Sequence, residues 1–197
     1  MLAKIKKQPP GRLIAMGFAL VILIGALLLM LPVSVRNDAK VHFIDALFTS
    51  TSAVCVTGLI SIDVADHFTF FGQVVVAALI QIGGLGVTSI GVGLILAARK
   101  NIGIKGRILV KEALNIDGIK GIVRLVKAVL LMTFCFELAG VILSFIVFVQ
   151  DYPVLKALWI SIFHSIAAFN NSGFDILGGL LDLRTGCLLY TSDAADD

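Results

Sequence analysis

The 197-residue chain is 58% hydrophobic and only 15% charged, and its formal net charge at pH 7 is +3. Soluble domains carry about 25% charged residues, and the mean hydropathy of this chain is +1.02. We therefore expect an integral membrane protein of the all-α class. Because little chain is left outside the bilayer, the composition excludes an anchored soluble enzyme, a secreted disulfide scaffold and a nucleic-acid binder.

The first apolar run, residues 13–32, has the roughly 20 residues that a spanning helix needs. Basic residues before it predict, by the positive-inside rule, that the N-terminal segment 1–12 is cytoplasmic. These basic residues are Lys4, Lys6, Lys7 and Arg12. A cleaved signal peptide is the competing interpretation, which the length of the run disfavours.

A second predicted spanning helix, residues 70–98, would reach ~43 Å, which exceeds the ~30 Å hydrocarbon core, so it must tilt, bend or protrude. Its glycines predict close helix packing or a bend beside a pore. They are Gly83, Gly84, Gly86, Gly91 and Gly93. A phosphate-binding loop is disfavoured because no strand precedes the cluster and no Lys-Ser/Thr pair follows it.

A basic loop, residues 99–122, follows and is predicted to be cytoplasmic. Two cytoplasmic flanks require an even number of crossings, so the apolar stretch 46–62 between the two spanning helices should not cross. We expect it to be re-entrant from the outside, a geometry tolerated only where protein or a water-filled cavity satisfies its polar groups. The loop is foremost a topology signal; the family resemblance described below implies docking of a regulatory ring as the alternative.

The chain contains a weak internal repeat. Setting Gly58 over Gly173, an offset of 115, aligns three further identities, Phe48 with Phe163, Ser50 with Ser165 and Ala53 with Ala168. The basic flanks of the two long helices match at an offset of 112, which predicts a three-residue insertion. Each unit then consists of a helix, a re-entrant pore helix, an extended glycine-containing turn and a helix.

The first unit, residues 13–98, is expected to be complete, and the second, 123–186, to be partial. In the first, a pore helix over 44–54 and a filter over 55–58 lie between the two spanning helices. In the second, a spanning helix over 123–149 precedes a pore helix over 156–168 and a filter over 170–173.

The pore-helix interpretation has a chemical basis. Asp45 would lie near the positive N-terminal end of the first pore helix, and the negative end would point into the membrane, where it favours a cation. Carbonyls of the extended turn could then replace the hydration shell of an ion. The residues concerned are Cys55, Val56, Thr57 and Gly58, and in the second unit Asn170, Asn171, Ser172 and Gly173. Asp175 could concentrate cations at the mouth; an ordinary helix C-cap is the alternative for either turn.

Residues 48–59 and 168–175 resemble the first and second pore signatures of the Trk/Ktr/HKT potassium transporter superfamily, most closely the bacterial Ktr-type membrane subunit. The resemblance runs from about residue 13 to 182. It implies four helix-pore-helix repeats around one K⁺ pathway, with Gly58 and Gly173 as filter glycines. Relatives with serine at the first of these tend to carry Na⁺, so Gly58 favours K⁺.

The resemblance also implies K⁺ as the transported ion, with Na⁺ possible as a second, and no covalently bound cofactor. It implies a multi-pass protein of the bacterial plasma membrane, embedded in the lipid bilayer, which forms a homodimer and binds a cytosolic nucleotide-binding ring subunit. No nucleic acid is expected. The chain is not expected to be an enzyme. With one complete and one partial repeat of four, the fragment alone should not conduct.

Two other functions remain as alternatives. A secondary transporter with discontinuous helices would bind a small substrate at mid-membrane. An intramembrane enzyme is disfavoured because His42, His67 and His164 are scattered and no His-Glu-x-x-His motif is present.

Two residues within the predicted membrane segments have alternative roles. Glu137 is the sole acid inside a spanning segment and either forms an interhelical bond or contacts an ion. His164, in the second pore helix, is either a packing residue or a pH sensor.

The last residues, 187–197, break abruptly from the apolar pattern. They reverse-translate without mismatch into a transposase-type sequencing adapter read in frame, so we expect an artefact and exclude them from fold reasoning. An acidic disordered terminus is the alternative. The natural protein is then expected to continue differently near Gly186. The two other cysteines, Cys55 and Cys135, lie in apolar segments and predict neither a disulfide framework nor a metal site.

Overall fold

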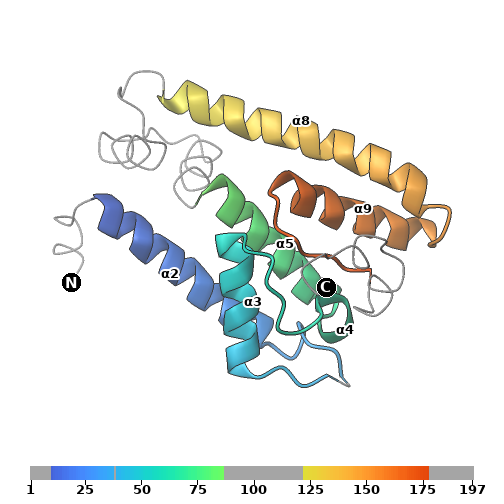
Figure 1. The fold of residues 1–197 in the computed structure, drawn as a ribbon, viewed down its shortest axis with the longest axis horizontal. Helices are drawn as coiled ribbons and strands as arrows, with labels where there is room; N and C mark the ends of the chain where they lie inside the picture. Colours follow the sequence, from blue (N-terminus) through green and yellow to red (C-terminus); the bar gives the residue numbers. More distant parts are fainter. Residues whose placement is uncertain (1–9, 38, 87–121, 178–197) are drawn as a thin grey trace, which may run out of the picture.

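The computed structural model describes residues 10–37, 39–86 and 122–177. Within these ranges the helices are α2 (Pro10–Leu29), α3 (Phe43–Cys55), α4 (Val64–His67), α5 (Phe70–Leu85), α8 (Ile122–Phe148) and α9 (Val154–Phe169) (Figure 1). Several predicted segments lie outside the described residues. They are most of the N-terminal flank, the end of the predicted 70–98 helix, nearly all of the basic loop 99–122 and the segment 187–197.

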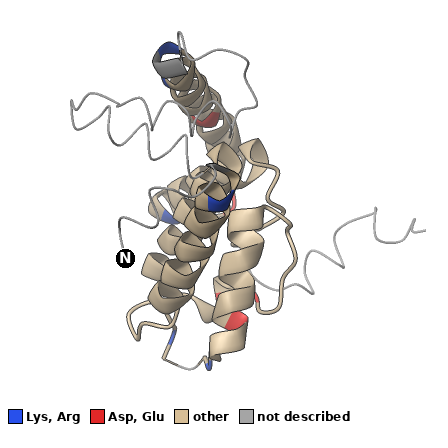
Figure 2. Cartoon of the chain, turned by 90° about the vertical axis from the view of Figure 1, so that its left-hand side faces the viewer, with Lys and Arg blue, Asp and Glu red and all other residues tan. Residues whose placement is uncertain are grey.

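Two of the helices are long and apolar enough to cross a membrane. The qualifying stretches are Gly11–Leu29 in α2 and Arg124–Phe148 in α8, and only 17% and 6% of their most apolar windows are buried. Figure 2 shows that most of the residues along the helices are neither acidic nor basic. This apolar, helical architecture agrees with the all-α membrane protein that the sequence predicts.

Helices α3 and α9 are shorter than a membrane is thick. They contain 13 and 16 residues, which corresponds to ~20 Å and ~24 Å against a hydrocarbon core of ~30 Å. They cover the two predicted pore helices, 44–54 and 156–168, with one or two additional residues at each end. Helix α2 ends at Leu29, before the predicted end at residue 32, and turns follow it.

Helix α5 is central to the described fold because it packs against α2, α3 and α9. Its buried face includes Val76 and Ile80, and the facing helices contribute Val54, Ile160 and Phe163 to the same core. Helix α2 also packs extensively against α3, and α8 against α9. The helix ends at Leu85 because Gly86, at φ +79°, leaves the helical range.

The link from α3 to α5 contains a short helix that the sequence analysis missed. Asp63 Oδ1 accepts the N–H groups of Ala65 and Asp66 and so caps α4. Thr69 caps α5 through Gly72 N–H, and its own hydroxyl donates to the Val33 carbonyl at 2.6 Å. The Thr69 contact holds the start of α5 against the turns that follow α2.

Candidate ion-binding site

The chain leaves α3 and α9 by the same backbone path. We call residues 55–58 the first turn and residues 170–173 the second turn. Val56 and Asn171 have φ of +56° and +53°, and Gly58 and Gly173 have φ of +72° and +70°. In each turn the third residue donates its N–H to a carbonyl five residues earlier, at 3.0 Å in the first and 2.8 Å in the second. The two conformations therefore correspond at an offset of 115.

The first and second turns contact each other directly through backbone atoms. A Cβ added to Gly58 would come 2.9 Å from the Ser172 carbonyl oxygen, and one added to Gly173 would come 3.1 Å from Gly58 Cα. Residues with a side chain rarely adopt φ near +70°. Both glycines are therefore required by conformation and by contact.

Each short helix is attached to its preceding long helix by the same contact. The residues are Ile22, Gly25 and Ser50 in the first unit and Glu137, Gly140 and Ser165 in the second. The serine hydroxyl donates to the carbonyl of the first residue, at 2.7 Å and 2.6 Å, and lies where the glycine has no side chain. The contact residues on the long helices therefore correspond at the same offset of 115 residues as the two turns. The alignment of the basic flanks had indicated an offset of 112 for these helices.

The two turns differ in one side-chain contact. The Thr57 hydroxyl pairs with the Ser52 hydroxyl at 2.9 Å. Ser172 occupies the position of Thr57, but Ala167 stands where Ser52 would be, and the Ser172 hydroxyl is buried without a partner among the described residues. An unpaired buried hydroxyl is unfavourable.

We expect Ala167→Ser to stabilise the second turn by about 0.5–1.5 kcal/mol, because the new hydroxyl gives Ser172 a partner. The measurement is the thermal unfolding midpoint of the purified protein in detergent. Ser52→Ala is the matched control and should lower the midpoint, since it leaves Thr57 unpaired. A lower midpoint for Ala167→Ser would contradict the pairing.

The C-terminal end of α5 approaches the end of α3 and the second turn through glycines. A Cβ on Gly83 would overlap the Val54 carbonyl oxygen, and one on Gly84 would overlap the Asn170 side chain. The close packing predicted from the glycine cluster is thus found at these two positions. Helix α5 is held against the last turn of α3 and the end of α9.

The two predicted acidic residues, Asp45 and Asp175, both lie outside the first and second turns. Asp45 lies at the N-terminal end of α3, where its carboxylate accepts the His42 N–H at 3.3 Å. Residues 55–58 follow the opposite end of that helix. Asp175 lies two residues beyond Gly173, and its carboxylate accepts the Leu177 N–H at 3.0 Å. Both carboxylates cap local backbone.

His164 and Glu137 both contact neighbouring groups within the fold. His164 Nδ1 lies 3.0 Å from the Ile160 carbonyl, and its ring centroid lies 5.4 Å from that of Phe148. These contacts are those of a packing residue. Glu137 has the Gln81 amide as a side-chain partner. An interhelical contact, one of the two roles considered for Glu137, is therefore present.

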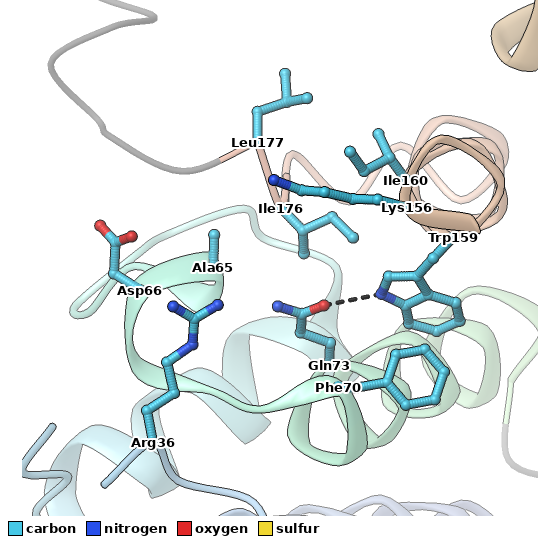
Figure 3. A pocket seen from close by; sticks show the side chains of 10 residues that line it. All are labelled: Arg36, Ala65, Asp66, Phe70, Gln73, Lys156, Trp159, Ile160, Ile176 and Leu177. Atoms are coloured by element: carbon cyan, nitrogen blue, oxygen red, sulfur yellow. Dashed lines mark hydrogen bonds between the residues drawn. The ribbon is translucent and has the colours of Figure 1, made fainter. Parts of the chain in front are cut away.

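A cavity of about 300 Å³ lies between α4, the start of α5 and the start of α9. Figure 3 shows Trp159 donating to Gln73 at its base, at 2.8 Å, with Arg36 and Lys156 among the lining residues. Lys156 Nζ also lies 4.7 Å from the Tyr152 ring centroid. Two basic residues against one acid, Asp66, make this cavity a poor cation site.

Sequence reasoning missed Gln81, whose amide oxygen accepts from Asn170 Nδ2 at 2.9 Å. A usable signal was present, because polar side chains in an apolar helix commonly bond across helices. Gln73 is a second residue of this kind.

The fold and the paired turns define an all-helical membrane protein in which two short helices meet through glycine turns at their C-terminal ends. A family model named TrkH and described as cation transport protein matches residues 12–179. The chain belongs to this family of cation transport proteins. The predicted resemblance to the Ktr-type membrane subunit is confirmed by the relatives.

Three relatives show the extent of the similarity. The chain is 46% identical over 167 residues to Ktr system potassium uptake protein B of Bacillus subtilis, covering 85% of this chain and 37% of that protein. It is 42% identical over 176 residues to potassium/sodium uptake protein NtpJ of Enterococcus hirae (89% and 39%). It is 36% identical over 163 residues to Ktr system potassium uptake protein B of Vibrio alginolyticus (83% and 35%). The chain thus spans about two fifths of the length of these relatives.

Proposed function

We propose that the chain forms the N-terminal part of a K⁺ uptake pathway in the bacterial plasma membrane. The observation that carries the proposal is the contact between the first and second turns. These turns have the same backbone conformation, and each follows a short helix. The names of the relatives support the ion, since each contains potassium uptake or potassium/sodium uptake.

Ion passage depends on backbone atoms in this proposal. Carbonyls of residues 55–58 and 170–173 replace water around a dehydrating cation, and the negative ends of α3 and α9 favour its positive charge. K⁺ then moves inward along its electrochemical gradient without covalent chemistry. Gly58 favours K⁺ as the principal ion, and Na⁺ is a candidate second ion.

The proposed topology follows from helix length and flanking charge. Helix α2 leaves a cytoplasmic N-terminus, α3 enters from outside without crossing, and α5 returns. Helices α8 and α9 repeat the first two steps, which makes the protein multi-pass. A second copy of the membrane subunit and a cytosolic nucleotide-binding ring are the proposed partners.

Four filter segments are needed to surround an ion, so the two turns require further repeats. The test is a chimera in which residues 1–179 of this chain replace the matching N-terminal part of the Bacillus subtilis relative. Expressed in Bacillus subtilis cells lacking their own potassium uptake proteins, the chimera should restore growth at low K⁺. This chain alone, at equal membrane abundance, should not.

Two results would contradict the proposal. Growth rescue by this chain alone would show that two turns suffice. Substrate exchange without K⁺-dependent growth in the chimera would instead favour a secondary transporter. The unaltered Bacillus subtilis protein is the positive control.

A further inference from the structure

The Asn170 side chain is fixed on three sides at the start of the second turn. Its Nδ2 donates to the Gln81 amide oxygen and to the Ile166 carbonyl, both at 2.9 Å. Its Oδ1 occupies the space left by Gly84, where a Cβ would overlap it. Asn170 precedes Gly173 by only three residues, so its position constrains the path of the second turn.

Gln81 joins this asparagine to a third helix. Its amide oxygen accepts from Asn170, and its side chain is the hydrogen-bond partner of the Glu137 carboxylate. A carboxylate only accepts when ionised, so the Gln81 NH₂ donates to it. With both ends of the amide used, its orientation is fixed.

Glu137 lies in the middle of α8 and contacts α9 as well. Its backbone carbonyl accepts the Ser165 hydroxyl at 2.6 Å. One carboxylate oxygen, Oε1, is buried and has no partner among the described residues. Removing its partner Gln81 would therefore leave a half-buried carboxylate poorly satisfied, which is costly in a membrane segment.

The first turn lacks this arrangement. Cys55 occupies the position of Asn170, 115 residues earlier, and is exposed. That turn has the hydroxyl pair of Thr57 and Ser52 instead, whereas the Ser172 hydroxyl of the second turn has no partner in the part of the chain that the structure describes. The two turns share a backbone conformation but are held by different side-chain contacts.

We propose that Glu137, acting through Gln81, is a positioning residue that holds Asn170 and thereby sets the ion selectivity of the second turn. We call Glu137, Gln81 and Asn170 the relay. The inference rests on the proposed function, because it assigns the relay a role in the filter. A shift of α8 relative to α5 would reach the second turn through the relay and leave the hydroxyl pair of the first turn intact.

The test measures the ratio of K⁺ to Na⁺ uptake by the chimera at matched amounts of membrane protein. Gln81→Leu should lower this ratio by roughly five- to tenfold, the factor expected from one buried hydrogen bond. Gln73→Leu is the matched control, because Gln73 is a buried glutamine of the same helix that bonds Trp159 instead of the turn. It should lower thermal stability and leave the ratio unchanged.

Conservative replacement of Glu137 distinguishes a positioning role through Gln81 from a role of its negative charge. Glu137→Gln should keep the ratio within about twofold, since its amide oxygen still accepts from Gln81, whereas Glu137→Leu should match Gln81→Leu. An unchanged ratio in Gln81→Leu would overturn the proposal. So would an equal loss in Glu137→Gln and Glu137→Leu, which would assign Glu137 a direct ion contact.

A second measurement does not depend on transport. In the relay, Gln81→Leu and Asn170→Ala remove the same contact, so their losses in thermal midpoint should be strongly non-additive in the double variant. Additive losses would overturn the relay. A chimera that folds, shows this coupling and takes up no K⁺ would instead contradict the proposed function.

Discussion

Gly58→Ala in the chimera is expected to lower K⁺ uptake at least tenfold. The added methyl group requires φ near +72° at a residue with a Cβ, which costs ~1–3 kcal/mol. It would also come 2.9 Å from the Ser172 carbonyl oxygen, so the second turn must move. Displacing both turns by one substitution should impair uptake more than the loss of stability alone would.

Two matched variants separate these effects. Gly173→Ala carries a similar φ and a similar approach to the facing turn, and should behave like Gly58→Ala. Gly11→Ala lies in α2, where its new Cβ would meet no atom of another described segment within 4 Å, and should transport normally. The measurements are initial rates of K⁺ uptake at matched membrane abundance. Near-normal uptake by Gly58→Ala would refute the assignment of the first turn to the ion pathway.

Gly83→Ala is expected to produce the largest loss of stability among the glycine substitutions outside the turns. Its Cβ would overlap the Val54 carbonyl oxygen, which belongs to the backbone of α3 and cannot rotate away. Helix α5 must therefore move off α3, and overpacking of this kind costs ~1–3 kcal/mol or more. The thermal unfolding midpoint of the chimera in detergent should fall, together with uptake.

The sign of this prediction is informative because alanine otherwise favours a helix over glycine by about 0.5–1 kcal/mol. Gly11→Ala, which meets nothing, should leave the midpoint unchanged or slightly raised. A rise for both variants would mean that α5 does not pack closely on α3.

The sequence could predict the positions of the helices because the physics of a membrane span is local. An uncharged run located α2, an apolar run interrupted only by Glu137 located α8, and the alignment of Gly58 with Gly173 located α3 and α9 to within two residues. The family resemblance followed from two short signatures. Helix α4 was missed because it has only four residues and depends on its cap, Asp63.

Side-chain partners could not be predicted in the same way. Asn170 was expected at the filter from its place in the repeat, but a repeat does not reveal which way a side chain points. In the structure it points to Gln81 on α5. The offset of 112 at the basic flanks was also misleading for the contacts, because those charges need only lie on the same side of the membrane, whereas Ser50 and Ser165 require fixed partners.

The spacing of these contacts along the chain bears on how the protein is made. Ser50 bonds a carbonyl 28 residues earlier, and Ser165 does the same. Gln73 and Gln81 bond partners 86 and 89 residues later. At about 5–20 residues per second, a ribosome needs roughly 4–18 s to add those partners. During that interval α2 and α3 can already be joined, while the amide oxygens of Gln73 and Gln81 in α5 still lack the partners that α9 and the second turn will supply.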